Sequence, residues 1–152
     1  RQTTMPGNDL SQYLSFLLAT ANRQMRMGLS ESIGRSAKDQ DFTEEHWRIL
    51  HVLSDEQGRS MGELAEIVQL NGPALTKNID KLVGRSVVQR AADPQDSRRV
   101  LVYISDLGLD TVTHLQRGVD AHQQNIEQAL GPRNTLKLKK LLETLIAESK
   151  VS

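Results

Sequence analysis

The chain has 152 residues, no cysteine and a formal net charge of zero. This length is sufficient for one domain with a hydrophobic core, and the absence of cysteine excludes disulfides, thiolate metal sites and thiol redox sensing. No apolar run approaches the roughly 20 residues of a membrane span, and residues 1–7 lack the apolar core of a signal peptide. We therefore expect a single cytoplasmic domain over residues 1–152, without a membrane partner.

The charges are unevenly distributed although their sum is zero. Acidic residues predominate from Lys38 to Gly58, whereas the stretch from Asn71 to Arg99 is locally positive. A basic segment within a neutral chain is compatible with a local DNA-binding face. A solvated surface of mixed charge is the alternative, and charge alone does not exclude it.

The first half of the chain predicts three helices. Apolar side chains recur at helical spacing from Leu10 to Leu29, which predicts a helix over about residues 8–30. Residues 34–41 are polar and indicate a connection. Thr43 is expected to cap a second helix that ends at Gly58. Ser60 and Glu63 have the spacing of a capping box at the start of a short third helix.

A fourth helix is predicted from about residue 72 to residue 84. Pro73 suits its first turn, where the missing N–H is not needed, and Leu75, Ile79 and Leu82 fall on one inward face. The third and fourth helices are short and are joined by a brief turn, which is the arrangement of a helix-turn-helix.

The periodicity then changes from 3.6 to 2. Val88 and Arg90 indicate one strand, and alternating apolar residues from Val100 to Ile104 indicate a second. Residues 93–97 form a turn cluster between them. We therefore expect a β-hairpin wing over about residues 87–104, and a winged helix-turn-helix lobe over residues 43–105.

Two further helices are predicted after the wing. Ser105 with Asp106 is expected to cap a long helix, and Gly131-Pro132 separates it from a last one. The predicted fold class is mainly α with a small β-hairpin wing. The apolar stripes of the terminal helices exceed what one lobe of this size can cover.

Several motifs together are specific to one family. Residues 93–98 read Asp-Pro-Gln-Asp-Ser-Arg, residues 102–105 read Val-Tyr-Ile-Ser, Gly108 follows, and residues 43–50 read Thr-Glu-Glu-His-Trp-Arg-Ile-Leu. From about Leu10 to Ser149 the chain resembles the MarR family of bacterial transcription regulators, whose wing pattern is close to D-P-x-D-R-R. It departs from the family most at Arg85-Ser86, where a glycine usually supplies a left-handed residue after the reader helix. Gly84 offers an earlier helix stop.

The resemblance implies a sequence-specific, dimeric DNA-binding regulator. It implies a repressor that binds a pseudo-palindromic operator in double-stranded DNA and is released by a small anionic or aromatic ligand. The terminal segments, residues 8–30 and 106–150, would then form the helical dimerisation part of a homodimer. Intramolecular packing in a monomer is the alternative.

The candidate DNA contacts follow from position and from the resemblance. The fourth helix is the reader by its position, with Lys77 in place of the family's arginine. The resemblance places Arg98 in the minor groove, braced by an ion pair to Asp96; an ordinary surface ion pair is the alternative. Arg90 and Arg99 are expected to contact phosphates. The full set of candidates is Asn71, Ala74, Thr76, Lys77, Asn78, Lys81, Arg90, Asp96, Arg98 and Arg99.

A ligand site between the lobe and the dimer helices is also implied by the resemblance. Its candidates are Arg23, Arg26, His46, Trp47 and Arg48, since arginine can bind a carboxylate and tryptophan can stack on a ring. The alternative is structural: a core tryptophan, an ion-paired Arg48 and a solvated arginine face. The histidine spacings do not include the i, i+4 pair of a helical metal site, so we expect neither a metal nor a cofactor.

Two other classes of function are alternatives to a DNA-binding regulator. An architectural or interaction protein could use the winged fold without a small-molecule effector, and a specificity ratio between operator and random DNA separates it from a regulator. We expect no enzymatic activity, because the chain has no G-x-S-x-G motif, phosphate-binding loop, catalytic triad or carboxylate pair.

Overall fold

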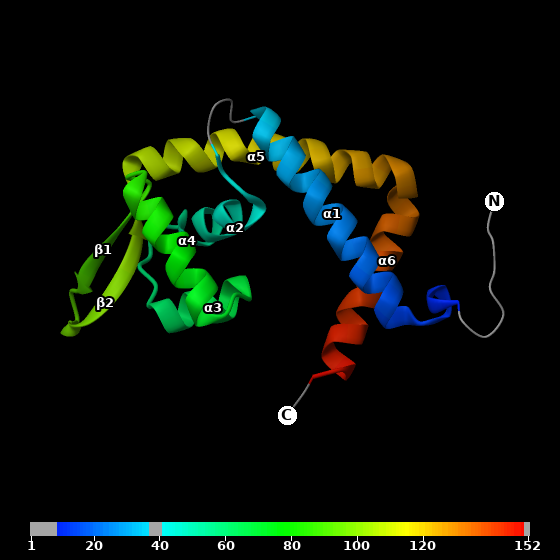
Figure 1. The fold of residues 1–152 in the computed structure, drawn as a ribbon, viewed down its shortest axis with the longest axis horizontal. Coiled ribbons are helices and arrows are strands. Elements are labelled where there is room, and N and C mark those ends of the chain that lie inside the picture. Colours follow the sequence, from blue (N-terminus) through cyan, green and yellow to red (C-terminus); the bar gives the residue numbers. More distant parts are fainter. Residues whose placement is uncertain (1–8, 37–40, 151–152) are drawn as a thin grey trace.

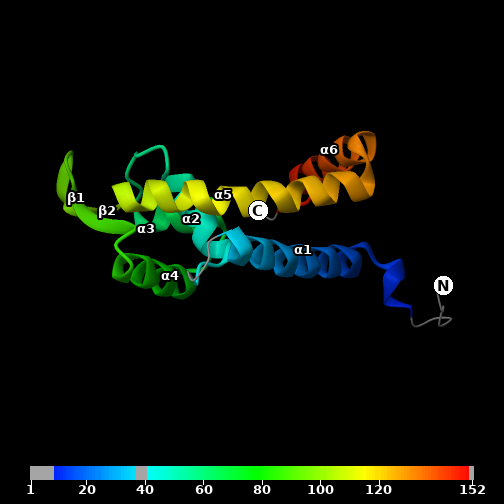
Figure 2. The same cartoon turned by 90° about the horizontal axis from the view of Figure 1, so that it is seen from above.

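The computed structural model describes residues 9–36 and 41–150 of the chain. It confirms a mainly helical fold with one antiparallel hairpin, and the elements follow one another in the predicted order. Figure 1 shows the lobe formed by α2, α3, α4 and the hairpin at one end, and the N-terminal part of α1 with α6 at the other. In the view from above, α1 and α5 run side by side between these two ends (Figure 2).

The first helix differs from the prediction at both ends. Asp9 caps a short 3₁₀ turn, Leu10–Gln12, so that α1 begins at Leu14 and runs to Ser36. The helix continues past residue 30 because Ile33 is fully buried and the Ser32 hydroxyl donates a hydrogen bond of 2.7 Å to the carbonyl of Gly118 in α5. Residue 8 and residues 37–40 of the predicted connection lie outside the described part of the chain.

The next two helices begin at the predicted caps. Thr43 caps α2 (Glu44–Leu53), and His46 completes a reciprocal capping box with it. This helix ends at Leu53 rather than at Gly58, because Ser54 closes its last turn onto the carbonyl of His51. Ser60 and Glu63 form the predicted capping box of α3 (Met61–Val68), which ends at the left-handed residue Gln69.

The reader helix α4 spans Gly72–Gly84, as predicted, with Pro73 in its first turn. The side-chain oxygen of Asn71 accepts a hydrogen bond of 2.8 Å from the backbone N–H of Ala74 and so caps the helix. The chain leaves the helix through Ser86, which has φ 63°. Serine therefore adopts the left-handed conformation that favours glycine, two residues after Gly84.

The wing is a hairpin of β1 (Val88–Asp93) and β2 (Asp96–Ile104). Only Pro94 and Gln95 form its turn, which is shorter than the predicted cluster of residues 93–97, because Asp96 already pairs with Asp93. The ladder has an irregularity between Ala92 and Asp93. Arg59, before α3, adds a bridge of two backbone hydrogen bonds to Val102, an extension that the sequence pattern did not predict.

Two helices follow the wing, α5 (Asp106–Leu130) and α6 (Pro132–Glu148), and Ser105 caps α5 as predicted. The continuous hydrophobic core lies inside the lobe, where the buried side chains of α2, α3 and α4 meet those of β1, β2 and the first half of α5. Outside the lobe, α1 and α6 expose apolar side chains that the described residues do not cover.

Candidate nucleic-acid interface and an adjoining cleft

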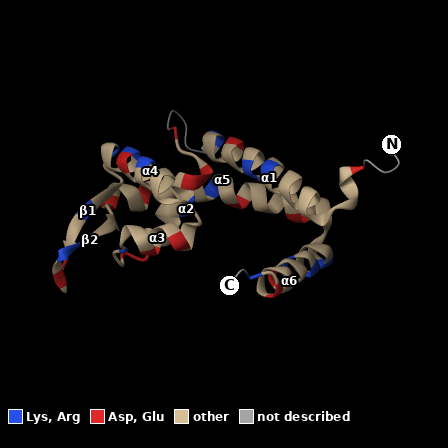
Figure 3. Ribbon diagram, turned by 60° about the horizontal axis from the view of Figure 1, so that its bottom comes forward, with Lys and Arg blue, Asp and Glu red and all other residues tan. Residues whose placement is uncertain are grey.

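The reader helix presents Thr76 and Lys77 to solvent, while Ala74 is half-buried. Lys81, one turn further along, is also exposed, but its ammonium lies 3.2 Å from the carboxylate of Asp41. That contact lowers the pKa of Asp41 through a hydrogen bond and the positive charge of Lys81. Figure 3 shows basic residues on α4 and near the tip of the hairpin. Thr76, Lys77 and Lys81 are therefore exposed as predicted, whereas the predicted exposure of Ala74 is wrong, and contact of these residues with DNA stays a prediction.

Asn78 is placed differently from its neighbours on α4. Its side chain is half-buried, and its amide nitrogen donates hydrogen bonds of 3.0 Å to Glu45 of α2 and to the carbonyl of Ala74. The helical spacing alone assigned this residue to the exposed reading face. The structure turns it instead toward α2, because the start of α2 packs beside α4.

The wing tip carries the predicted pair of Asp96 and Arg98. The Arg98 guanidinium lies 3.1 Å from the Asp96 carboxylate, which also accepts a hydrogen bond from the Arg98 backbone N–H. These two bonds hold the pKa of Asp96 below its usual value. The Arg98 side chain is 89% exposed. It therefore projects from the wing tip, while its contacts with Asp96 orient it.

Arg90 and Arg99, predicted to contact phosphates, each have an acidic partner. Arg90 of β1 lies 2.6 Å from Asp80 of α4 and so joins the wing to the reader helix. Arg99 lies 2.9 Å from Glu63 and 3.7 Å from Asp93. A DNA phosphate would have to compete with these carboxylates.

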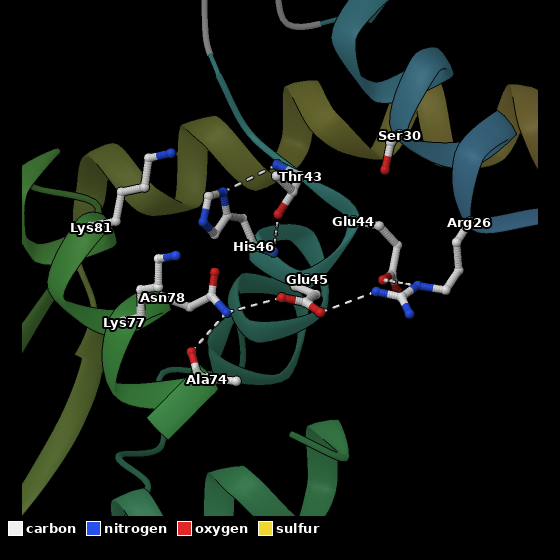
Figure 4. Close-up of a pocket in the computed structure, with 10 residues that line it drawn as sticks. All are labelled: Arg26, Ser30, Thr43, Glu44, Glu45, His46, Ala74, Lys77, Asn78 and Lys81. Atoms are coloured by element: carbon white, nitrogen blue, oxygen red, sulfur yellow. Dashed lines mark hydrogen bonds and ion pairs between the residues drawn. The ribbon is translucent and has the colours of Figure 1, made fainter. Parts of the chain in front are cut away.

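A cleft of about 540 Å³ lies beside the reader helix (Figure 4). Its walls come from three helices that are far apart in sequence: α1, the start of α2, and α4. It contains cations and carboxylates together with hydroxyl and amide groups. The residues that line it are Arg26, Ser30, Thr43, Glu44, Glu45, His46, Ala74, Lys77, Asn78 and Lys81.

Only part of the predicted ligand set meets in this cleft. Arg26 and His46 line it, and Arg23 lines a neighbouring hollow along α1 together with Arg26. Trp47 faces α5 and donates a hydrogen bond of 3.0 Å from its indole to Gln116.

Arg48 is also directed away from the cleft. It binds Glu44 through two nitrogens, at 2.6 to 2.9 Å, and donates to the carbonyl of Val68 at 2.6 Å. Trp47 and Arg48 therefore make structural contacts within the protein, which is the alternative to a ligand-binding role for these two residues.

His46 is almost completely buried at the edge of the cleft. Its Nδ1 accepts a hydrogen bond of 3.1 Å from the backbone N–H of Thr43. Burial, assisted by the nearby charges of Lys81 and Arg85, lowers the pKa of His46 to about 4. The ring is therefore uncharged at neutral pH. It forms part of the cleft wall and of the capping box of α2, and it adds no charge to the cleft.

Sequence reasoning did not identify Ser30, Glu44 and Glu45 as cleft residues. The two glutamates stand in the first turn of α2, where acidic residues are common because they favour a helix N-terminus. That local role gave no sign that Glu45 also reaches a helix more than thirty residues away.

Neither a metal site nor a membrane span emerges from the described residues. Residues 9–36 and 41–150 contain no group of three or more histidine and acidic side chains able to hold a metal ion. Within the same ranges, no helix has the length and hydropathy needed to cross a membrane.

The chain is similar to known transcriptional regulators. A family model described as MarR family matches residues 40–99. The HTH-type transcriptional regulator FarR of Neisseria gonorrhoeae is 29% identical over 105 residues, which make up 69% of this chain and 72% of that protein.

Solved structures share the fold over nearly the whole chain. The transcriptional repressor CouR, bound to a 23-mer DNA duplex, has a TM-score of 0.82 at 23% identity, covering 94% of this chain and 99% of that one. The PcaV regulator from Streptomyces coelicolor, in complex with its natural ligand, has a TM-score of 0.79 at 19% identity, covering 96% and 100%. The family match spans the helix-turn-helix and most of the wing, and it confirms the predicted resemblance to the MarR family of winged helix-turn-helix transcriptional regulators.

Proposed function

We propose that this protein is a homodimeric repressor that binds a pseudo-palindromic operator and is released by a small anionic ligand. The observation that supports DNA reading best is the wing tip, where Arg98 is 89% exposed and oriented by Asp96. A single arginine so presented suits the concentrated negative potential of a narrow minor groove. The exposed Thr76 and Lys77 of α4 are then the candidates for the major groove.

Dimerisation through the terminal helices would explain their exposed apolar residues. Soluble monomers rarely expose large contiguous apolar patches, and a two-fold pair of lobes would present two reader helices about one DNA turn apart. The large apolar side chains of α1 and α6 that are at least one third exposed are Leu14, Phe16, Leu17, Met25, Met27, Leu136, Leu138, Leu141 and Ile146.

The mass in solution tests the dimer. At micromolar concentration we expect twice the chain mass for the wild type and a monomer for Leu141→Glu. The matched control is Ile67→Glu, because Ile67 is also exposed but lies on α3; this variant should remain dimeric. A wild-type monomer would contradict this part of the proposal.

A selection from random duplex DNA, followed by gel shifts at matched salt, tests operator binding. We expect a palindromic preferred sequence, bound at least about a thousandfold more tightly than random DNA, as specific regulators bind. Equal affinity for both DNAs would instead favour an architectural protein without an effector.

The cleft is our candidate for the ligand site. Arg26, Lys77 and Lys81 line a space of about 540 Å³ that also contains Glu44 and Glu45, and this volume is in the size range of small-molecule sites. PcaV, which shares this fold, has a natural ligand. A ligand can release DNA only if it binds one arrangement of the lobes more tightly than the other. We therefore expect DNA affinity to fall when a suitable carboxylate is added, and Arg26→Ala to weaken that response.

A further inference from the structure

One carboxylate in the cleft joins the first helix to the reader helix. Glu45 Oε2 lies 3.1 Å from a guanidinium nitrogen of Arg26 in α1, and Glu45 Oε1 accepts a hydrogen bond of 3.0 Å from the Asn78 amide in α4. Figure 4 shows the three side chains in a row, with Glu45 in the middle. Arg26 and Asn78 are thus linked through a residue of α2.

The second carboxylate beside Arg26 is held more firmly. Glu44 is buried and is bound by Arg48 through two nitrogens, and it lies 3.7 Å from Arg26. The Glu45 side chain is 30% exposed, and within the described residues its side-chain partners are Arg26 and Asn78. An incoming anion can therefore replace Glu45 at Arg26 with less disturbance than it would cause at Glu44.

Asn78 has little capacity left to read a base. An asparagine reads adenine with its amide oxygen and amide nitrogen together, and its NH₂ group has two donors. Both donors of the Asn78 amide nitrogen are used inside the protein, one by Glu45 and the other by the carbonyl of Ala74. The Asn78 side chain is half-buried and lines the cleft, whereas Thr76 is exposed.

We propose that Glu45 couples α1 to the reader helix, that Asn78 orients this helix rather than reading a base, and that a small organic carboxylate acts by taking Arg26 from Glu45. The proposal rests on the proposed function, because it describes how a ligand in that cleft reaches the reader. A carboxylate is the ligand class that matches the two-pronged geometry of arginine, and Lys77 and Lys81 stand on the opposite wall of the cleft.

A mutant cycle on the selected operator tests the coupling. We expect Asn78→Ala and Glu45→Ala each to lower operator affinity about three- to tenfold, and the double variant to lose little more than either single one, as coupled residues do. Glu31→Ala is the control, since Glu31 pairs with Arg35 of the same helix, and it should leave affinity unchanged. Effects that multiply in the double variant would overturn the coupling.

The base-preference profile separates orienting from reading. Loss of a base reader relaxes preference at one position of the operator, whereas loss of an orienting residue lowers affinity while the preferred sequence stays the same. We expect the second result for Asn78→Ala. Relaxed preference at one base pair would overturn the role proposed for this residue. If the wild type prefers no sequence at all, the proposed function itself fails, which is a different outcome.

Titration with benzoate, as a simple aromatic carboxylate, tests the ligand step. Glu45→Ala should bind benzoate several-fold more tightly than the wild type, because the competing carboxylate has been removed from Arg26. The variant Arg26→Ala/Glu45→Ala should lose this gain. Equal affinity in the wild type and Glu45→Ala, or no binding by Glu45→Ala, would overturn the competition.

Discussion

The Ser105 hydroxyl donates a hydrogen bond of 2.6 Å to the carbonyl oxygen of Ser86, and the Ser105 side chain also accepts one from the N–H of Gly108. Ser86 is the left-handed residue between α4 and the wing, and Ser105 is the N-cap of α5. One side chain therefore connects the end of the reader helix, the base of the wing and the start of the long helix. The family's usual glycine at residue 86 is absent, but the backbone conformation that it serves is retained.

The strain at Ser86 can be measured by replacing it with glycine. The left-handed conformation costs an L-residue about 1–2 kcal/mol, and the greater freedom of glycine in the unfolded chain offsets part of this. Ser86→Gly should therefore raise the free energy of unfolding by up to about 1 kcal/mol in denaturant titrations. Ser54→Gly is the control, because Ser54 has an ordinary φ of −69° and the same change should destabilise there. A loss of stability in Ser86→Gly would contradict the strain.

Gly108 is needed for the close approach of α5 to the wing. A Cβ at this position would clash with the Val87 backbone carbonyl and with the Ile104 side chain. Gly108→Ala should therefore lower the melting temperature by several degrees and displace the wing, since backbone atoms cannot move aside cheaply. Gly62→Ala, in α3, is the matched control because its Cβ would meet no atom within 4 Å. Equal melting temperatures for the two variants would contradict the close approach.

Arg98→Ala should weaken operator binding about tenfold or more, with no change in melting temperature. The side chain is almost fully exposed, so the fold loses little, whereas the minor groove loses its cation. The slope of log affinity against log salt should fall by about one. Gel shifts over a salt series measure both quantities. Arg35→Ala, an exposed arginine of α1 paired with Glu31, is the control, and the role of Arg98 is disproved if the two variants bind alike.

His46 makes stability depend on pH below neutrality. Its pKa is about 4 in the folded protein and about 6.5 when unfolded, so between these values the unfolded chain binds a proton that the folded chain does not. This group therefore removes about 1 kcal/mol of stability for each unit that the pH falls from about 6.5 to 4.

His46→Gln removes the titration and keeps a side chain that suits the capping box. The unfolding free energy of this variant should fall less steeply than that of the wild type over the same pH window, while His114→Gln, at an exposed position, should follow the wild type. Parallel slopes for the wild type and His46→Gln would show that the ring is not buried in its neutral form.

Elements whose signals lie within a few residues could be predicted from the amino-acid sequence. The caps at Thr43, Ser60 and Ser105 each bond a backbone N–H three residues later, and such contacts depend only on chain spacing. The hairpin and the pair of Asp96 and Arg98 are local in the same sense. These features carried the prediction of the winged lobe and of its family.

Contacts between helices could not be predicted in this way, because they depend on how the helices pack. Helical spacing placed Asn78 on the reading face, but packing against α2 brought it to Glu45, 33 residues away. In the same way, burial of Ile33 against the core extended α1 beyond the predicted end, and Arg48 found the carbonyl of Val68 rather than the cleft. A local pattern shows which side of a helix is apolar. The position of a polar side chain at the edge of that side depends on which neighbouring helix packs there, and that is set by the packing of the whole core.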